Sequence, residues 1–88
     1  MTYKIVIENK ALAELAKLPK KIQRQIANKI NQLATNTHPS GCKVLQKNNS
    51  LYRIRSGDYR IVYQIRENEV LVLVVRIGHR KDIYRKLR

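Results

Sequence analysis

Three arginines, Arg53, Arg55 and Arg60, lie close together in the stretch LYRIRSGDYR. A guanidinium is planar and permanently charged, and it can donate two parallel hydrogen bonds to one phosphate. Ser56-Gly57-Asp58 has the composition of a tight turn between the second and third arginines. The spacing therefore predicts a hairpin that gathers three cations, and a phosphodiester is a group that they suit well.

The alternative is a solvated basic face, because exposed arginines are common on surface strands. Any one of these arginines alone is readily explained in that way. Like charges that face each other across strands, however, destabilise a sheet. For the set as a whole we therefore favour an anion site over simple solvation.

If the anion is an RNA phosphodiester, the site can bind it or cleave it. Cleavage requires deprotonation of the 2′-hydroxyl, stabilisation of charge around the phosphorus, and protonation of the leaving 5′-oxygen. Arginine suits the second task and is a poor proton carrier, because it stays charged. His79 is the most orthodox proton carrier nearby, although a histidine beside a glycine is often structural.

Tyr84 is an unorthodox candidate for the same task. It follows Arg80 and Lys81 and precedes Arg85 and Lys86, and nearby positive charge favours a phenolate. Such a tyrosine can act as a base or stack on a nucleobase. It can equally be an amphipathic side chain that holds a C-terminal helix on the sheet.

Composition limits the partners. The 88 residues predict one domain, 1–88, with 19 Lys+Arg against 6 Asp+Glu and a formal net charge of +13. So strong a bias favours nucleic acid, an acidic protein or an anionic membrane. The membrane is the weakest option, because Val70–Val75 is the longest aliphatic run and a span needs about 20 apolar residues.

The location and the cofactors follow from similar reasoning. The N-terminus lacks the apolar region of a signal peptide, and the single cysteine, Cys42, forms no intramolecular disulfide, so we expect a cytoplasmic protein. Cys42, His38 and His79 are too few and too scattered to form a metal site. We therefore expect no metal and no cofactor.

Periodicity predicts the elements that position these residues. We expect a strand at 3–7, a helix from Lys10 capped by Asn9, and a second helix after Pro19. Four strands should follow at 43–46, 51–55, 59–65 and 70–77, with Gly78 ending the last one. A short helix at 80–87 completes the chain.

The alternation also assigns side chains to faces of the sheet. Tyr59, Ile61, Tyr63 and Ile65 should form one apolar face, and Arg60 should lie on the other. Short connections make neighbouring strands antiparallel. The sequence therefore predicts an α+β fold in which an N-terminal strand precedes a helical hairpin. This hairpin should pack on one face of a mainly antiparallel sheet, with the arginines on the other face.

The order YRIRSGDYRIVYQI, followed by VLVLVVRIGHRKDIY, resembles the RelE toxins of the RelE/ParE toxin–antitoxin superfamily over nearly the whole chain. The resemblance implies a compact α+β fold similar to microbial ribonucleases. It also implies metal-independent cleavage of messenger RNA in the ribosomal A site through attack by the 2′-hydroxyl. The implied partners are the ribosome, an acidic antitoxin that wraps around the toxin, and operator DNA bound only through the antitoxin complex.

The resemblance also implies roles for individual residues. The family's two basic strand positions fall on Arg53 and Arg55, where the best-known members have lysines, and its later positions fall on Arg60, Arg80 and Tyr84. His79 is a possible auxiliary group. An arginine at position 55 removes any general-base role that a lysine would have there. Further contacts with RNA or the ribosome are expected from Lys43, Lys47, Arg76 and Lys81.

Two other functions fit the same fold. A ParE-like toxin would inhibit DNA gyrase without cleaving nucleic acid, although ParE-type chains generally lack the combination of Arg60, Arg80 and Tyr84. A non-catalytic RNA-binding module or corepressor would need only the charge. The sequence leaves open the codon preference, the identity of the general base and the antitoxin.

Overall fold

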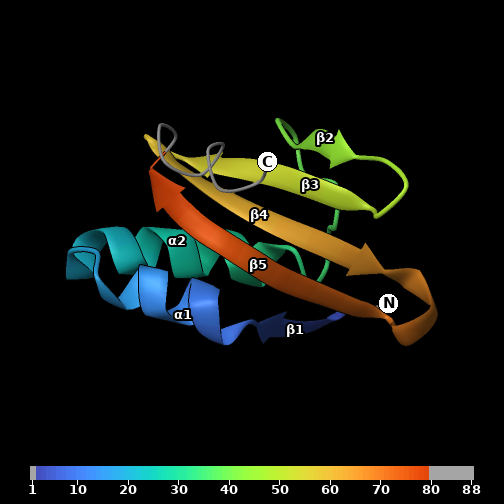
Figure 1. The fold of residues 1–88 in the computed structure, drawn as a ribbon, viewed down its shortest axis with the longest axis horizontal. Helices are drawn as coiled ribbons and strands as arrows, with labels where there is room; N and C mark the ends of the chain where they lie inside the picture. Colours follow the sequence, from blue (N-terminus) through green and yellow to red (C-terminus); the bar gives the residue numbers. More distant parts are fainter. Residues whose placement is uncertain (1, 80–88) are drawn as a thin grey trace.

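The sheet of this protein is built from strands whose side chains alternate between two faces, and the structure, a computed structural model that describes residues 2–79, shows how they are arranged (Figure 1). In chain order the elements are β1 (Lys4–Ile7), α1 (Asn9–Ala16), α2 (Lys20–Gln32), β2 (Lys43–Gln46), β3 (Leu51–Ser56), β4 (Tyr59–Arg66), the 3-10 turn η1 (Glu67–Glu69) and β5 (Leu71–His79).

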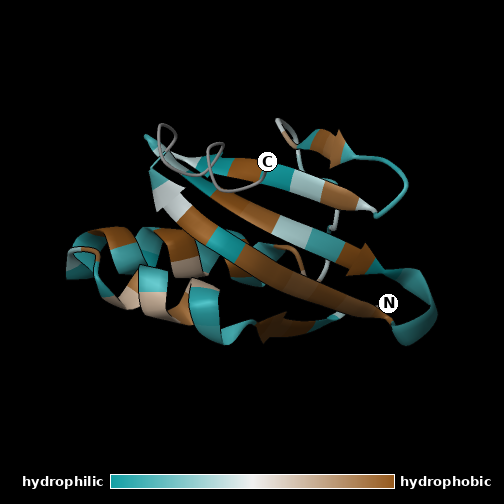
Figure 2. Ribbon diagram, in the orientation of Figure 1, coloured by the Kyte–Doolittle hydropathy of each residue, from teal (hydrophilic) through white to brown (hydrophobic). Residues whose placement is uncertain are grey.

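The strands form one five-stranded sheet in the order β1-β5-β4-β3-β2. The pairs β2–β3, β3–β4 and β4–β5 are antiparallel, and only β1 pairs in parallel, along β5. Because β5 has a neighbour on each side, its apolar run lies inside the sheet, and Figure 2 shows much of it as a hydrophobic ribbon. The predicted α+β fold is confirmed.

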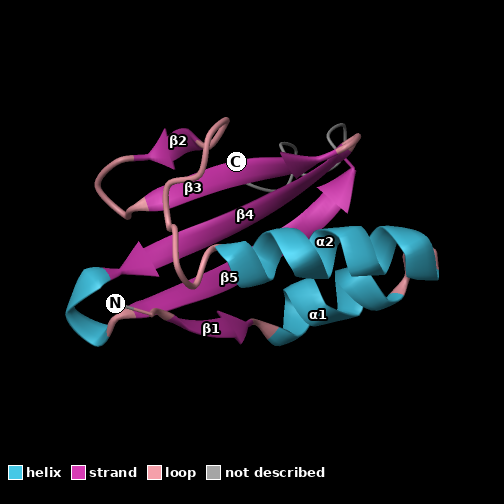
Figure 3. Ribbon diagram, turned by 180° about the vertical axis from the view of Figure 1, so that it is seen from behind, coloured by secondary structure: helices cyan, strands magenta, loops and turns pink. Residues whose placement is uncertain are grey.

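Both helices cover the same face of the sheet, as the view from behind shows (Figure 3). Apolar side chains spaced along α2, including Ile26 and Ile30, are buried against this face. The strands contribute the apolar face that alternation predicted. The described core comprises Ala11, Ile26, Ile30, Leu33, Ile54, Ile61, Tyr63, Ile65, Val72, Val74 and Ile77.

The β3–β4 hairpin closes through a two-residue turn, Gly57-Asp58, because Ser56 pairs with Tyr59. Gly57 has a φ of +60°, a left-handed conformation that glycine adopts without steric cost. The turn is one residue shorter than predicted, since Ser56 belongs to β3. It fixes the register that sets Arg55 opposite Arg60.

Several predicted boundaries differ from the structure by one or two residues, and two of these concern named residues. Asn9 is the first residue of α1 and Glu8 takes the N-cap position, without a side-chain cap hydrogen bond. Gly78 does not end the last strand, since Gly78 and His79 still pair with Arg60 and Tyr59 on β4. The helix predicted at 80–87 lies outside the described residues. Within residues 2–79, no helix is long and apolar enough to cross a membrane.

Candidate functional site

Four cations converge on the sheet face opposite the helices. Arg55 lies directly opposite Arg60 in the β3–β4 ladder, and Lys43 lies opposite Arg53 in the β2–β3 ladder. Directly paired residues share a face, and so do residues two apart on one strand. We call this surface, which carries Lys43, Arg53, Arg55 and Arg60, the arginine face. Each of its two rows sets one positive charge against another.

Burial divides the four cations into two kinds. Lys43 and Arg55 are exposed, whereas Arg53 and Arg60 are each only 7% exposed. Arg53 lies on the face opposite the helices, as alternation predicted, but its side chain is buried there. A buried cation loses its hydration and needs a counter-charge or hydrogen-bond acceptors in return.

That compensation is incomplete within residues 2–79. The Arg53 Nη1 and Arg60 Nε atoms are buried and have no hydrogen-bond partner there. Neither side chain forms an ion pair with a described carboxylate. An anion with several oxygens, such as a phosphodiester, would supply the counter-charge that these two guanidinium groups lack among the described residues.

Arg76 of β5 pairs with Val62 of β4, so it lies on the same sheet face as Arg60. It does not join this group as a free cation. Its guanidinium forms a two-pronged ion pair with Glu14 of α1, with Nη2–Oε2 at 2.7 Å and Nε–Oε1 at 3.1 Å. The Arg76 side chain is 7% exposed and that of Glu14 is 19% exposed. This charge is therefore largely neutralised inside the fold, which weakens the predicted RNA contact by Arg76.

Glu14 also accepts a backbone hydrogen bond from the part of β5 that lies beyond its pairing with β1. The parallel pairing of β1 ends where Ile7 meets Val74, and beyond that point α1 packs along β5. The Ile77 N–H, on β5 beyond this point, donates a hydrogen bond of 3.0 Å to Glu14 Oε1. Sequence reasoning missed this role. The available signal was an acidic residue among the apolar positions Ala11 and Leu15 of the first helix.

His79 lies at the end of β5 on the other face from Arg60. It is paired with Tyr59, and the two rings meet edge to face with centroids 5.8 Å apart. Tyr59 packs against the core beneath the helices. The structure therefore does not bring His79 onto the arginine face. Of the remaining predicted residues, Lys47 is exposed in the turn after β2, and Arg80, Lys81 and Tyr84 lie outside the described residues.

Aromatic packing beneath the hairpin supports the two strands that carry the arginines. Tyr52 of β3 stacks on Tyr63 of β4 with centroids 5.9 Å apart, and His38 meets Tyr52 edge-on at 4.9 Å. The Tyr63 hydroxyl donates to the Thr37 carbonyl at 2.8 Å, which ties the loop after α2 to the sheet. Burial, with the nearby Cys42 as a second cause, raises the pKa of Tyr63 above its usual value. The protonated Tyr63 hydroxyl therefore has a structural role as a hydrogen-bond donor.

Comparison with known proteins gives a consistent result. A family model described as the ParE toxin of the type II toxin–antitoxin system parDE matches residues 5–84. The chain is 34% identical to a putative RelE-like toxin protein of Escherichia coli, over 96% of this chain and 92% of the relative. It is 30% identical to the mRNA interferase toxin RelE of E. coli K12, over 92% of this chain and 86% of the relative.

A solved structure shares the fold. The toxin chain in the crystal structure of the intact E. coli RelBE toxin–antitoxin complex superposes with a TM-score of 0.76. The two chains are 28% identical, and the match covers 88% of this chain and 95% of the other.

Proposed function

Because the chain belongs to the RelE/ParE superfamily of type II toxins, and to its RelE-type members, we propose that it is an endoribonuclease that cleaves messenger RNA in the ribosomal A site. The observation that carries this proposal is the pair of buried, incompletely hydrogen-bonded guanidinium groups, Arg53 and Arg60, on one sheet face. A relative that is 30% identical is named an mRNA interferase, which supports the same activity.

The reaction needs no co-reactant from outside the RNA. The 2′-oxygen attacks the adjacent phosphorus and forms a new P–O bond, while the P–O5′ bond breaks. One proton leaves the 2′-hydroxyl, and one is delivered to the departing 5′-oxygen. The products are a 2′,3′-cyclic phosphate and a 5′-hydroxyl end.

The arginine face would stabilise the negative charge that develops on the phosphorane oxygens. Arg53 and Arg60 are held by packing, so they would be oriented before the substrate arrives. Arg55 is exposed and would hold the neighbouring backbone. The family resemblance assigns a further cation to Arg80 and the proton transfer to Tyr84. His79, the possible auxiliary group, lies on the other sheet face and is given no role here.

If cleavage depends on the ribosome, the chain needs few proton carriers of its own. Arginines bind and polarise a phosphodiester, but they do not fix the in-line geometry of the 2′-hydroxyl. Messenger RNA held in the A site would arrive with much of that geometry already set. We therefore expect the isolated protein to cut free RNA poorly.

The positive charge also favours an acidic protein partner that neutralises the toxin. An acidic antitoxin that lays a helix on the surface would reduce the net charge of +13 and stabilise the fold by linkage. The structural relative that is 28% identical was solved as a toxin–antitoxin complex, which supports this expectation. Binding of operator DNA would then occur only through the complex.

Inhibition of DNA gyrase is the second candidate, because the matching family model carries the ParE description. The two activities separate in one experiment. The chain is expressed alone, the 5′ ends of cellular messenger RNA are mapped, and DNA supercoiling is assayed in parallel. The proposal expects cuts in phase with codons and normal supercoiling. Relaxed DNA with intact messenger RNA would instead support gyrase inhibition.

Growth arrest tests the third reading, a non-catalytic module. Arg60→Ala and Tyr84→Phe should each relieve the arrest, since each would remove a group assigned to the reaction. If both variants arrest growth as strongly as the unmodified chain, this site is not catalytic.

A further inference from the structure

A trough lies between α2 and the open edge of β3. Among the described strands, β2 pairs with β3 only as far as Arg53, so the segment from Ile54 to Ser56 has no strand on its outer side. Two adjoining hollows of about 330 and 380 Å³ follow this edge and share Lys29, Gln32 and Arg55 in their lining.

The wall formed by α2 is a single polar stripe. Gln25, Asn28, Lys29 and Gln32 follow one another at helical spacing and line the trough together. Ser40, from the loop after α2, and Ser56 of β3 add hydroxyl groups. Amides and hydroxyls offer both donors and acceptors, as a ribose and a phosphate require.

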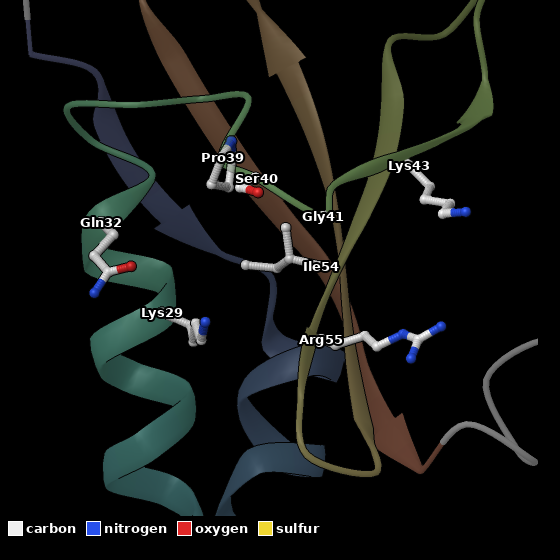
Figure 4. Close-up of a pocket in the computed structure, with 8 residues that line it drawn as sticks. All are labelled: Lys29, Gln32, Pro39, Ser40, Gly41, Lys43, Ile54 and Arg55. Atoms are coloured by element: carbon white, nitrogen blue, oxygen red, sulfur yellow. The ribbon is translucent and has the colours of Figure 1, made fainter.

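The ionisable residues that contribute to the lining of the trough are all basic among the described residues. Lys29, Lys43 and Arg55 line it, whereas no Asp or Glu of residues 2–79 does. None of the three cations forms an ion pair with a described residue. Figure 4 shows Lys29 on α2 and the charged ends of Lys43 and Arg55 across β3 from it, so cations flank both sides of the strand edge.

We infer that the trough binds the sugar–phosphate backbone of an RNA strand. This inference rests on the proposed function and adds a second RNA contact to it, beyond the reacting phosphodiester. Arg55 connects the two regions, because it belongs to the arginine face and also lines both hollows. A strand that leaves the arginine face at Arg55 would cross the open edge of β3 and enter the trough.

An acidic peptide fits these walls less well. A helical peptide docks through apolar or aromatic anchors that fill pockets. A peptide added as a strand could pair only with the short open segment from Ile54 to Ser56. The described apolar side chains of the lining are Ile54 and Pro39, and Ile54 is only 4% exposed. Lysine, serine, asparagine and glutamine are, by contrast, among the residues that contact nucleic-acid backbones.

The bound backbone can come from the messenger RNA beyond the cut or from ribosomal RNA, which share the same chemistry. Two probes distinguish these sources. One is a fluorescent RNA of about ten nucleotides with 2′-deoxyribose throughout its central part, so that it is not cleaved there. The other is the empty ribosome without messenger RNA. Binding of the full chain to each probe is measured as a function of salt concentration.

Matched pairs of variants isolate the trough from general charge. Lys29→Gln is compared with Lys21→Gln, and Asn28→Asp with Asn31→Asp; all four positions are exposed on α2, and Lys21 and Asn31 line neither hollow. For Lys29→Gln, the slope of log affinity against log salt should fall by about 0.7, which is one single-strand phosphate contact. Asn28→Asp should weaken binding about fivefold. Both controls should bind like the unmodified chain.

Each outcome is decisive. A trough-specific effect on the short RNA identifies messenger RNA as the occupant, and the same effect on empty ribosomes alone identifies ribosomal RNA. The inference is wrong if each trough variant has the same salt slope and the same RNA affinity as its control variant. It is also wrong if the trough variants lose affinity only for an acidic antitoxin peptide. Binding is measured without cleavage. A protein that cleaves no messenger RNA, but whose salt dependence of RNA binding changes in Lys29→Gln, would therefore contradict the nuclease proposal and leave this inference standing.

Discussion

Arg53 and Arg60 lie diagonally across the β3–β4 ladder, on one sheet face, and each keeps a buried guanidinium nitrogen without a hydrogen-bond partner among residues 2–79. Their cross-strand neighbours Lys43 and Arg55 are also cations. A sheet gains no stability from this arrangement, because desolvation and like-charge repulsion both oppose it. The arrangement is therefore best explained by an anion that binds there.

Arg53→Met tests directly whether the buried guanidinium destabilises the fold. The substitution keeps most of the side-chain volume and removes a buried charge, so the free energy of unfolding without RNA should rise by about 1 kcal/mol. Arg55→Met, at an exposed position on the same strand, should change it by less than about 0.5 kcal/mol. Urea denaturation measures both variants. A clear loss of stability in Arg53→Met would mean that the guanidinium has a structural role.

Glu14→Gln should be strongly destabilising. It preserves the shape of the side chain and an acceptor for the Ile77 N–H, but it leaves Arg76 buried without its counter-charge. The expected loss in the free energy of unfolding is about 3 kcal/mol. Glu69→Gln is the control, because it removes the exposed pair with Arg66 at 3.7 Å and should cost less than about 1 kcal/mol. Equal effects in denaturation would refute the buried pair.

Tyr63 predicts a dependence of stability on alkaline pH. Its pKa is raised in the folded state, so above pH ~10 the unfolded chain releases the phenol proton while the folded chain keeps it. The free energy of unfolding should therefore fall by about 1.4 kcal/mol per pH unit from this residue, until the pH passes the folded-state pKa.

Tyr63→Phe removes that contribution. The variant loses the hydrogen bond to the Thr37 carbonyl, about 1 kcal/mol at neutral pH, but its stability should decline less steeply above pH ~10. Tyr3→Phe is not a suitable control, because the Tyr3 hydroxyl donates to Glu67 and its pKa is also raised. Parallel pH profiles for Tyr63→Phe and the unmodified chain would contradict this account of Tyr63.

Much of the fold was predictable from periodicity. Alternation at Tyr59–Ile65 assigned Ile61 and Tyr63 to the helix side and Arg60 to the other, and the apolar run in β5 marked an inner strand. The parallel pairing of β1 with β5 was not predicted, because it joins segments far apart in the sequence. The extension of β5 through Gly78 depends on β4 as a partner, which local propensity does not describe.

The candidate site was predictable in part, for a related reason. The two-residue spacing of Arg53 and Arg55, with a turn before Arg60, predicted one shared face. The pairing of Lys43 with Arg53 depends on a register shift between Val44 and Gln46, which alternation alone does not reveal. The neutralisation of Arg76 by Glu14 depends on contact between a helix residue and a strand residue 62 positions apart. His79 fell on the other face because β5 carries a bulge relative to β4 and continues one residue past Gly78.

The most direct test of the central claim is the single-turnover rate of messenger RNA cleavage on programmed ribosomes. Arg60→Ala is compared with Arg66→Ala, an exposed position on the same strand β4. If buried Arg60 stabilises the phosphorane, its loss should slow cleavage about 100- to 1,000-fold, whereas Arg66→Ala should leave the rate within about twofold. Equal rates for the two variants, with both folded and bound to the ribosome, would contradict the account.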